Sequence, residues 1–109
     1  MEFVKYSVEG NVGILTVSRP AALNALNDQV IRELSEALDL VDPDVVRCLI
    51  VRGEGEKAFV AGADIGQMSG LSKAEGRAFG KLGNDVFRKL ETLPVPTIAA
   101  VCGFALGGG

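Results

Sequence analysis

The sequence has 109 residues, of which 48% are hydrophobic and 23% charged, a composition that is typical of a globular domain and excludes a disordered chain. The formal net charge is −3, and the scattered lysines and arginines form no basic patch, which argues against a protein that binds nucleic acid. Histidine is absent, so these residues contain neither a Ser-His-Asp triad nor a histidine-ligated metal site.

The chain shows no signal peptide and no membrane segment. Its first ten residues lack a basic region followed by a long apolar stretch, and the apolar run at 98–106 is too short to span a bilayer. We therefore expect a cytoplasmic protein. Cys48 and Cys102 each lie in an apolar run without a partner at short spacing, and we expect both to be buried core thiols rather than a disulfide or metal ligands.

The first elements predicted are two strands of a hairpin. Apolar residues alternate over 4–8, Gly10-Asn11 can form the turn, and residues 12–17 continue as a mostly apolar strand. Pro20 follows shortly after and ends the second strand, because proline cannot donate a hydrogen bond to a continuing ladder.

A helix and a buried strand are predicted next. Asn27 is a plausible N-cap, and apolar residues then recur at helical spacing over 30–41. The helix is expected to end at Asp42-Pro43, since the residue before a proline avoids the helical region. Residues 45–51 read as a buried strand, with 53–55 as the following turn.

The second half of the chain repeats this succession. Residues 57–61 suggest a short extended segment, and Ser72 begins a capping box that opens a long amphipathic helix. The prolines of 94–96 end this helix, and residues 97–102 are predicted to form another buried strand. Strands that alternate with helices indicate an α/β fold with crossover connections, in which a strand-strand-helix unit occurs twice.

The last residues are unusual for the end of a domain. An apolar strand leads into 107–109, three consecutive glycines that are typical of a turn where backbone approaches another group closely. We therefore expect the chain to be a fragment of a longer protein. In that case the apolar faces of both helices and of the last strand would be exposed.

Two glycine-bearing junctions that follow strands, 61–65 and 103–109, are the candidate sites of chemistry. Backbone N–H groups at such junctions can point into a crevice, and two of them aimed at one oxygen form an oxyanion hole. Structural alternatives remain open: Gly62 can be a turn glycine with positive φ, and the triple glycine a flexible turn. Asp64 is either a catalytic carboxylate or the cap of a short turn beginning at Ile65.

Three segments in this order closely resemble the enoyl-CoA hydratase/isomerase (crotonase) family: SRPAALNAL at 18–26, KAFVAGADI at 57–65 and PTIAAVCGFALGGG at 96–109. The resemblance covers essentially the whole chain. It implies a crotonase-like superhelix of β-β-α units, of which residues 1–109 would be the N-terminal portion of a single domain.

The resemblance also implies a substrate and a site. Members of this family bind acyl-CoA thioesters and stabilise the enolate that forms at the thioester carbonyl. By position, the backbone N–H groups of Ala63 and Gly108 resemble the two oxyanion donors. No metal and no separate cofactor are implied, because coenzyme A is part of the substrate. The residues that match CoA-contacting positions are Ala22, Leu23, Ala61, Ala63, Asp64, Ile65 and Gly66.

The sequence departs from the family pattern where CoA phosphates are bound. Many relatives carry a basic residue at the positions that match Ala21 and Gly66, and both are uncharged here. Arg19 or Lys57 either compensates for this loss or is an ordinary solvated surface charge.

The resemblance implies an enoyl-CoA hydratase, a lyase of fatty acid or short-chain acyl-CoA metabolism that also dehydrates 3-hydroxyacyl-CoA. Its two catalytic glutamates would follow Gly109, so these residues alone are expected to be inactive. The alternatives are an enoyl-CoA isomerase or another acyl-CoA enzyme of the family, and a non-catalytic acyl-CoA-binding protein. The full-length parent is expected to be a homotrimer or hexamer.

Overall fold

The computed structural model describes all 109 residues and contains every helix and strand predicted above. It adds a short strand and two short helices. None of its helices combines the length and the apolar character needed to cross a membrane. The strands are β1 (Val4–Glu9), β2 (Val12–Val17), β3 (Cys48–Gly53), β4 (Ala58–Val60), β5 (Thr97–Ala100) and β6 (Phe104–Ala105). The helices are the 3₁₀ turn η1 (Pro20–Ala22), α1 (Asp28–Asp39), α2 (Ile65–Met68) and α3 (Lys73–Glu91).

The main sheet has four strands in the order β1-β2-β3-β5. β1 and β2 form the predicted antiparallel hairpin, whose turn places Gly10 at a φ of 61°. β2, β3 and β5 run parallel, with Ile14 beside Ile50 and Ile50 beside Ile98. Parallel neighbours need crossover connections, which α1 and α3 supply, so the predicted α/β class is confirmed.

A second, two-stranded sheet pairs β4 with β6 in parallel. The chain order is thus two strands and a helix, two strands and a helix, then two strands. The first strand of the second and third units joins the main sheet, and the second strand joins the small one. This repetition confirms the predicted β-β-α units, and it places the residues after β4 beside those around β6.

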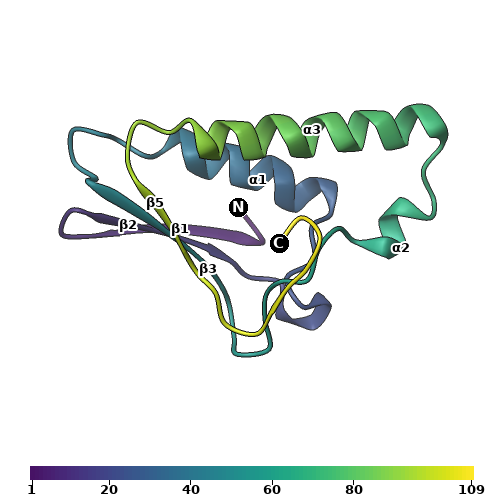
Figure 1. The fold of residues 1–109 in the computed structure, drawn as a ribbon, viewed down its shortest axis with the longest axis horizontal. Coiled ribbons are helices and arrows are strands. Elements are labelled where there is room, and N and C mark those ends of the chain that lie inside the picture. The colour runs from purple at the N-terminus through teal and green to yellow at the C-terminus, as the bar shows by residue number, and fades with distance from the viewer.

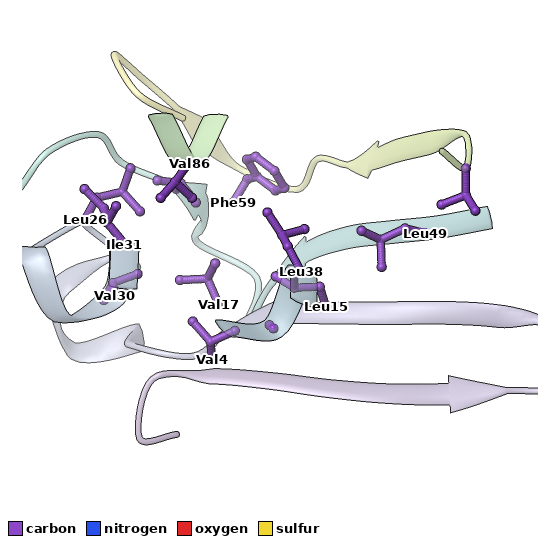
Figure 2. Packing of buried hydrophobic residues seen from close by; sticks show 13 residues of the cluster. Val4, Leu15, Val17, Leu26, Val30, Ile31, Leu38, Leu49, Phe59 and Val86 are labelled. Atoms are coloured by element: carbon purple, nitrogen blue, oxygen red, sulfur yellow. The ribbon is translucent and has the colours of Figure 1, made fainter. Parts of the chain in front are cut away.

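Both long helices cover the same side of the main sheet, where they lie next to each other (Figure 1). The core between these layers is apolar (Figure 2). The side chains that are 2% exposed or less within this core are Val4, Leu15, Val17, Val30, Ile31, Ala37 and Leu49. Burial of each valine, leucine or isoleucine side chain in this set stabilises the fold by roughly 1.5–3 kcal/mol.

The two long helices begin at the predicted caps. The side chain of Asn27 accepts a hydrogen bond of 2.8 Å from the N–H of Val30 and so begins α1. At α3 the Ser72 hydroxyl accepts from the N–H of Glu75, while the Glu75 carboxylate accepts from the N–H of Ser72. These local bonds satisfy helix donors that have no partner inside the helix.

β3 begins at Cys48, three residues later than the sequence predicts. The residues before it form a turn around Asp42, whose carbonyl oxygen accepts from the N–H groups of Val45 and Val46. The Asp42 carboxylate also accepts from the N–H of Asp44. Aspartate favours such turns, and this one delays the strand although Val45 and Val46 have high strand propensity.

The predicted burial of residues 97–102 and of the two cysteines is wrong. All four residues of β5 are exposed, as is Cys102, and Cys48 is only half-buried. β5 is the edge strand of the main sheet, and an open groove of about 280 Å³ separates it from the helices. No element of this chain covers that groove, so the expected exposure of the last strand is confirmed. The exposure expected of the apolar helix faces is wrong for Ile31 and Leu38 of α1 and for Val86 of α3, which are buried in the core.

Candidate functional site

Three segments meet at one end of the structure, and they are the three that carry the sequence motifs. The N–H of Leu26 donates to the carbonyl oxygen of Gly62 at 2.8 Å, and the N–H of Asp64 donates to that of Leu26 at 2.8 Å. The N–H of Leu106 reaches the carbonyl oxygen of Val60 at 3.2 Å. The strand β4 and the residues after it are therefore held between the loop after β2 and the chain around β6.

This arrangement leaves the N–H of Ala63 without a partner. Leu26 bonds the carbonyl of Gly62 and the N–H of Asp64, as in a parallel β-bridge to Ala63. In such a bridge the intervening residue directs its own N–H away from its partner strand. The N–H of Gly108 also donates to no group in the structure, whereas the N–H of Gly109 bonds the carbonyl oxygen of Leu106. Two backbone donors that are 45 residues apart in sequence thus stay free.

The two residues with these free N–H groups line the same cavity. A hollow of about 150 Å³ is lined by Ala63 and Gly108 together with Leu26, Ile31 and residues of α3. Apart from Asn84, the side chains around it are apolar, and none is a carboxylate. The structure therefore brings together the two residues predicted as oxyanion donors. Chemically, such a cavity can hold an apolar group beside an oxygen that accepts from two N–H groups.

Asn24 holds the loop after β2 in place, although the sequence analysis did not single it out. Its side chain is buried and donates from Nδ2 to the carbonyl oxygens of Ala58 and Phe59, at 2.9 and 3.2 Å. Its Oδ1 accepts from the N–H of Arg19. Asn24 and Leu23 both have positive φ, which asparagine tolerates better than most residues. That tolerance was the signal available in the sequence.

The cap role that the sequence analysis allowed for Asp64 is confirmed. Its carboxylate accepts from the N–H of Gln67 and begins the short helix α2. The same carboxylate forms an ion pair of 2.7 Å with Arg19, which also donates to the carbonyl oxygen of Ala25. Asp64 is not among the residues that line the cavity at Ala63. The Asp64 carboxylate therefore stabilises the local structure, in the residue next to the free N–H of Ala63.

The ion pair also decides the role of Arg19. Its side chain is only 21% exposed, and its guanidinium lies 5.5 Å from the ring centre of Phe3 and contacts Asp64. It is therefore not a solvated surface charge, and its charge is already paired with a carboxylate. Lys57, by contrast, is exposed and borders a separate hollow of about 240 Å³ together with Leu23.

The residues predicted to contact CoA do not all lie in one place. Leu23 borders the hollow with Lys57, and its carbonyl oxygen accepts from the N–H of Ala61 at 3.1 Å. Ala22 ends η1, whereas Ile65 and Gly66 begin α2 and are exposed. The structure therefore brings only some of the predicted CoA-contacting residues together.

We expect the Asp64→Asn variant to unfold with a free energy lower by about 1–2 kcal/mol at neutral pH, because it keeps the cap but loses the charged pair. The hydrogen bond from Arg19 lowers the pKa of Asp64 below its ordinary value. The ion pair therefore stabilises the fold above the ordinary carboxyl pKa, and this contribution is lost as the pH falls through the folded-state pKa. Urea unfolding of both proteins between neutral pH and about pH 3 measures the difference, which should shrink on acidification.

Asp85→Asn is the matched control for this prediction. Asp85 also pairs with a basic residue, Lys81, but both side chains are more than half exposed. Exposed pairs contribute little, so this variant should change the unfolding free energy by less than about 0.5 kcal/mol. Equal effects at both sites would show that the pair at Asp64 has no special structural role.

Known proteins are similar to this chain in sequence and in fold. The family model described as enoyl-CoA hydratase/isomerase matches residues 7–109. The short-chain-enoyl-CoA hydratase of Clostridium acetobutylicum and the crotonyl-CoA hydratase of Syntrophomonas wolfei are 53% and 50% identical to the chain. Each alignment covers 93% of the chain and 39% of the relative. The chain thus spans about two fifths of the length of these relatives.

A solved structure has a similar fold over nearly the whole chain. The crystal structure of an enoyl-CoA hydratase from Bacillus anthracis superposes with a TM-score of 0.95 at 31% identity. The match covers 99% of this chain and 43% of that one.

Proposed function

This chain belongs to the enoyl-CoA hydratase/isomerase family, and from that premise we propose that the protein containing it hydrates short-chain 2-enoyl-CoA thioesters. The names of the two relatives at 50% and 53% identity support this reaction and a short acyl chain. Hydration adds a hydroxyl group at C3 and a proton at C2, and the reverse reaction dehydrates a 3-hydroxyacyl-CoA. The protein would therefore be a lyase.

The observation that carries the proposal is the pair of free N–H groups at one cavity. Attack of water at C3 moves electrons towards the thioester carbonyl, whose oxygen becomes an enolate oxygen. We propose that this oxygen accepts from the N–H groups of Ala63 and Gly108, which donate to nothing else in the fold. Donors that are already fixed in place stabilise such a charge without reorganisation, and each contributes about 2.7–4 kcal/mol to lowering the barrier.

The acid and base of the reaction are not among these residues. No carboxylate borders the cavity at Ala63 and Gly108, so nothing there can take a proton from water or deliver one to C2. We propose that two glutamates beyond Gly109 supply both steps, as the family resemblance implies. Determining the residues that follow Gly109 tests this directly, and the absence of both glutamates would contradict hydration.

The 109 residues by themselves should be catalytically inert. We expect no hydration of crotonyl-CoA above the uncatalysed rate, because the oxyanion donors polarise a thioester but cannot activate water. The check is the loss of enoyl-thioester absorbance with purified chain from a host that lacks its own hydratase. Turnover by this chain would show that its own residues supply an acid or base.

The proposed function is tested on the intact protein with crotonyl-CoA as substrate. Formation of 3-hydroxybutanoyl-CoA, identified by mass, supports hydration. Conversion of a 3-enoyl-CoA to the 2-enoyl isomer without water addition would instead support the isomerase alternative. Tight binding of acyl-CoA with no product from either substrate would indicate a non-catalytic binding protein.

Two segments of the chain are candidates for contact with coenzyme A. We propose that the segments 22–23 and 61–66 border the adenine, phosphates and pantetheine. Because Arg19 is held by Asp64, Lys57 is the remaining exposed cation beside Leu23 that can approach a phosphate. Glu54 and Glu56 border the same hollow and would oppose it, which makes a weak phosphate contact the expected outcome.

Three broader features rest on the family resemblance alone. We propose that the intact protein is cytoplasmic, takes part in fatty acid or short-chain acyl-CoA metabolism, and assembles as a homotrimer or hexamer. The open apolar groove beside β5 is consistent with further chain or a neighbouring subunit covering this face. Light scattering of the intact protein measures the assembly, and a monomer would contradict it.

A further inference from the structure

One wall of the cavity at the two free donors is formed by helix α3. Its residues Phe79, Gly80, Gly83, Asn84 and Phe87 border the same hollow as Ala63 and Gly108. They are spaced so that they share one face of the helix over about two turns. Leu26 and Ile31 close the cavity from the loop after β2 and from α1, and they lie near Val86 of α3 at one end of the core (Figure 2).

The glycines of this wall are not required by the backbone. Gly80 and Gly83 lie inside a regular helix and do not have the positive φ that favours glycine. Glycine in a helix interior destabilises it by about 1 kcal/mol relative to alanine. The helix thus carries two unfavourable residues that its own geometry does not need.

Packing does not require them either. A Cβ atom added at Gly80 would meet no atom within 4 Å, and one added at Gly83 would meet only the Cδ1 atom of Ile31 at 3.8 Å, an ordinary contact. At Gly53 and Gly109, by contrast, an added Cβ would lie 2.2 and 2.0 Å from a backbone oxygen. What Gly80 and Gly83 preserve is empty space in the cavity wall.

We propose that Gly80 and Gly83 set the acyl-chain length that the site accepts, an inference that rests on the proposed function. A thioester whose oxygen lies at Ala63 and Gly108 directs its acyl chain into a hollow that is bordered by these glycines and by aromatic rings. At about 150 Å³ the hollow is smaller than the pockets of roughly 300–1,000 Å³ that hold drug-sized ligands, and it suits a chain of few carbons. Any side chain at position 80 shortens the space available to the acyl chain.

The test compares Gly80→Val with Gly76→Val in the intact protein. Gly76 lies one turn earlier in α3, an added Cβ there also meets nothing within 4 Å, and it does not border the cavity. Both changes introduce the same side chain into the same helix. Values of kcat/KM are measured with crotonyl-CoA, trans-2-hexenoyl-CoA and trans-2-octenoyl-CoA.

The ratio of kcat/KM for hexenoyl-CoA to that for crotonyl-CoA should fall at least about 10-fold in Gly80→Val, since a lost methylene site in an apolar pocket changes discrimination by 10-fold or more. Gly80→Ala and Gly83→Ala should lower the same ratio less, and Gly76→Val should leave it within about twofold. A ratio that stays within twofold in Gly80→Val overturns the proposal. An equal loss of kcat/KM for all chain lengths also overturns it. So does a failure to fold that Gly80→Val and Gly80→Ala share, because the space beside Gly80 would then be filled by protein and not by the acyl chain.

Failure of the proposed function is recognised separately. If the wild-type protein does not hydrate crotonyl-CoA, the same variants are compared by calorimetric binding of butanoyl-CoA and hexanoyl-CoA, which need no turnover. A selective loss of hexanoyl-CoA affinity in Gly80→Val would then support the acyl-chain role of these glycines without the hydratase activity. An unchanged ratio of the two affinities would contradict that role.

Discussion

Replacing Ala63 by proline should lower kcat of the intact protein for crotonyl-CoA by about 10²–10³, with a much smaller effect on KM. Proline has no N–H, so the variant loses one of the two proposed oxyanion donors. The change removes no hydrogen bond of the fold, because the N–H of Ala63 bonds to nothing, while Leu26 bonds Gly62 and Asp64. Loss of this N–H should therefore affect the catalytic rate more than the stability of the fold.

Ala63→Ser is the control for this variant, since it retains the N–H and adds a single small group. Its kcat should stay within about threefold of the wild type, and both variants should show the circular dichroism spectrum of the wild type. A folded Ala63→Pro protein with unchanged kcat would exclude the Ala63 N–H as a donor. An equal loss in both variants would point to the side chain rather than to the N–H.

Replacing Gly103 by alanine should lower the free energy of unfolding by about 3–5 kcal/mol, a large effect for a single methyl group. Gly103 has a φ of 75°, and an added Cβ would lie 2.1 Å from the carbonyl oxygen of Lys57. The neighbouring N–H of Phe104 bonds that same oxygen at 3.1 Å. The methyl group would therefore push β6 away from β4, and with it the glycines around position 108.

Gly55→Ala separates the two causes of this effect. Gly55 also has positive φ, 83°, but an added Cβ there meets nothing within 4 Å. Only the conformational cost of about 1–2 kcal/mol remains. Urea unfolding of the two variants measures the difference, and a loss at Gly103 no larger than that at Gly55 would show that β6 does not lie against β4 in this way.

Local signals made most of the fold predictable. The hairpin of β1 and β2 follows from alternation and from Gly10-Asn11, and both long helices begin at the residues whose side chains can cap them, Asn27 and Ser72. Each of these features depends on residues only a few positions apart. The positions at which these elements begin and turn are therefore decided largely within the segment itself.

Burial was harder to predict because it depends on what covers a strand. Residues 97–102 have the apolar composition of a central strand, yet β5 is an edge strand here and Cys102 is exposed. β6 was missed because a strand of two residues has no periodicity, and it forms only where it meets β4. Such pairing joins residues more than forty positions apart, which no local pattern specifies.

The candidate site shows the same division. The family resemblance led to Ala63 and Gly108, and the structure places both at one cavity with free N–H groups. Asn24 was not predicted as important, because its contacts with Ala58 and Phe59 are made across 34 and 35 residues of sequence. In the sequence, Gly80 and Gly83 are ordinary residues of a helical segment, and only the structure shows the cavity beside them.

The most direct test of the oxyanion site is a crystal structure of the intact protein with a bound saturated acyl-CoA, which cannot be hydrated. The thioester oxygen should lie about 2.7–3.1 Å from the backbone nitrogens of both Ala63 and Gly108. The acyl chain should lie against Gly80 and Gly83. A thioester oxygen that contacts neither nitrogen, with the acyl-CoA bound elsewhere, would contradict the proposed oxyanion site.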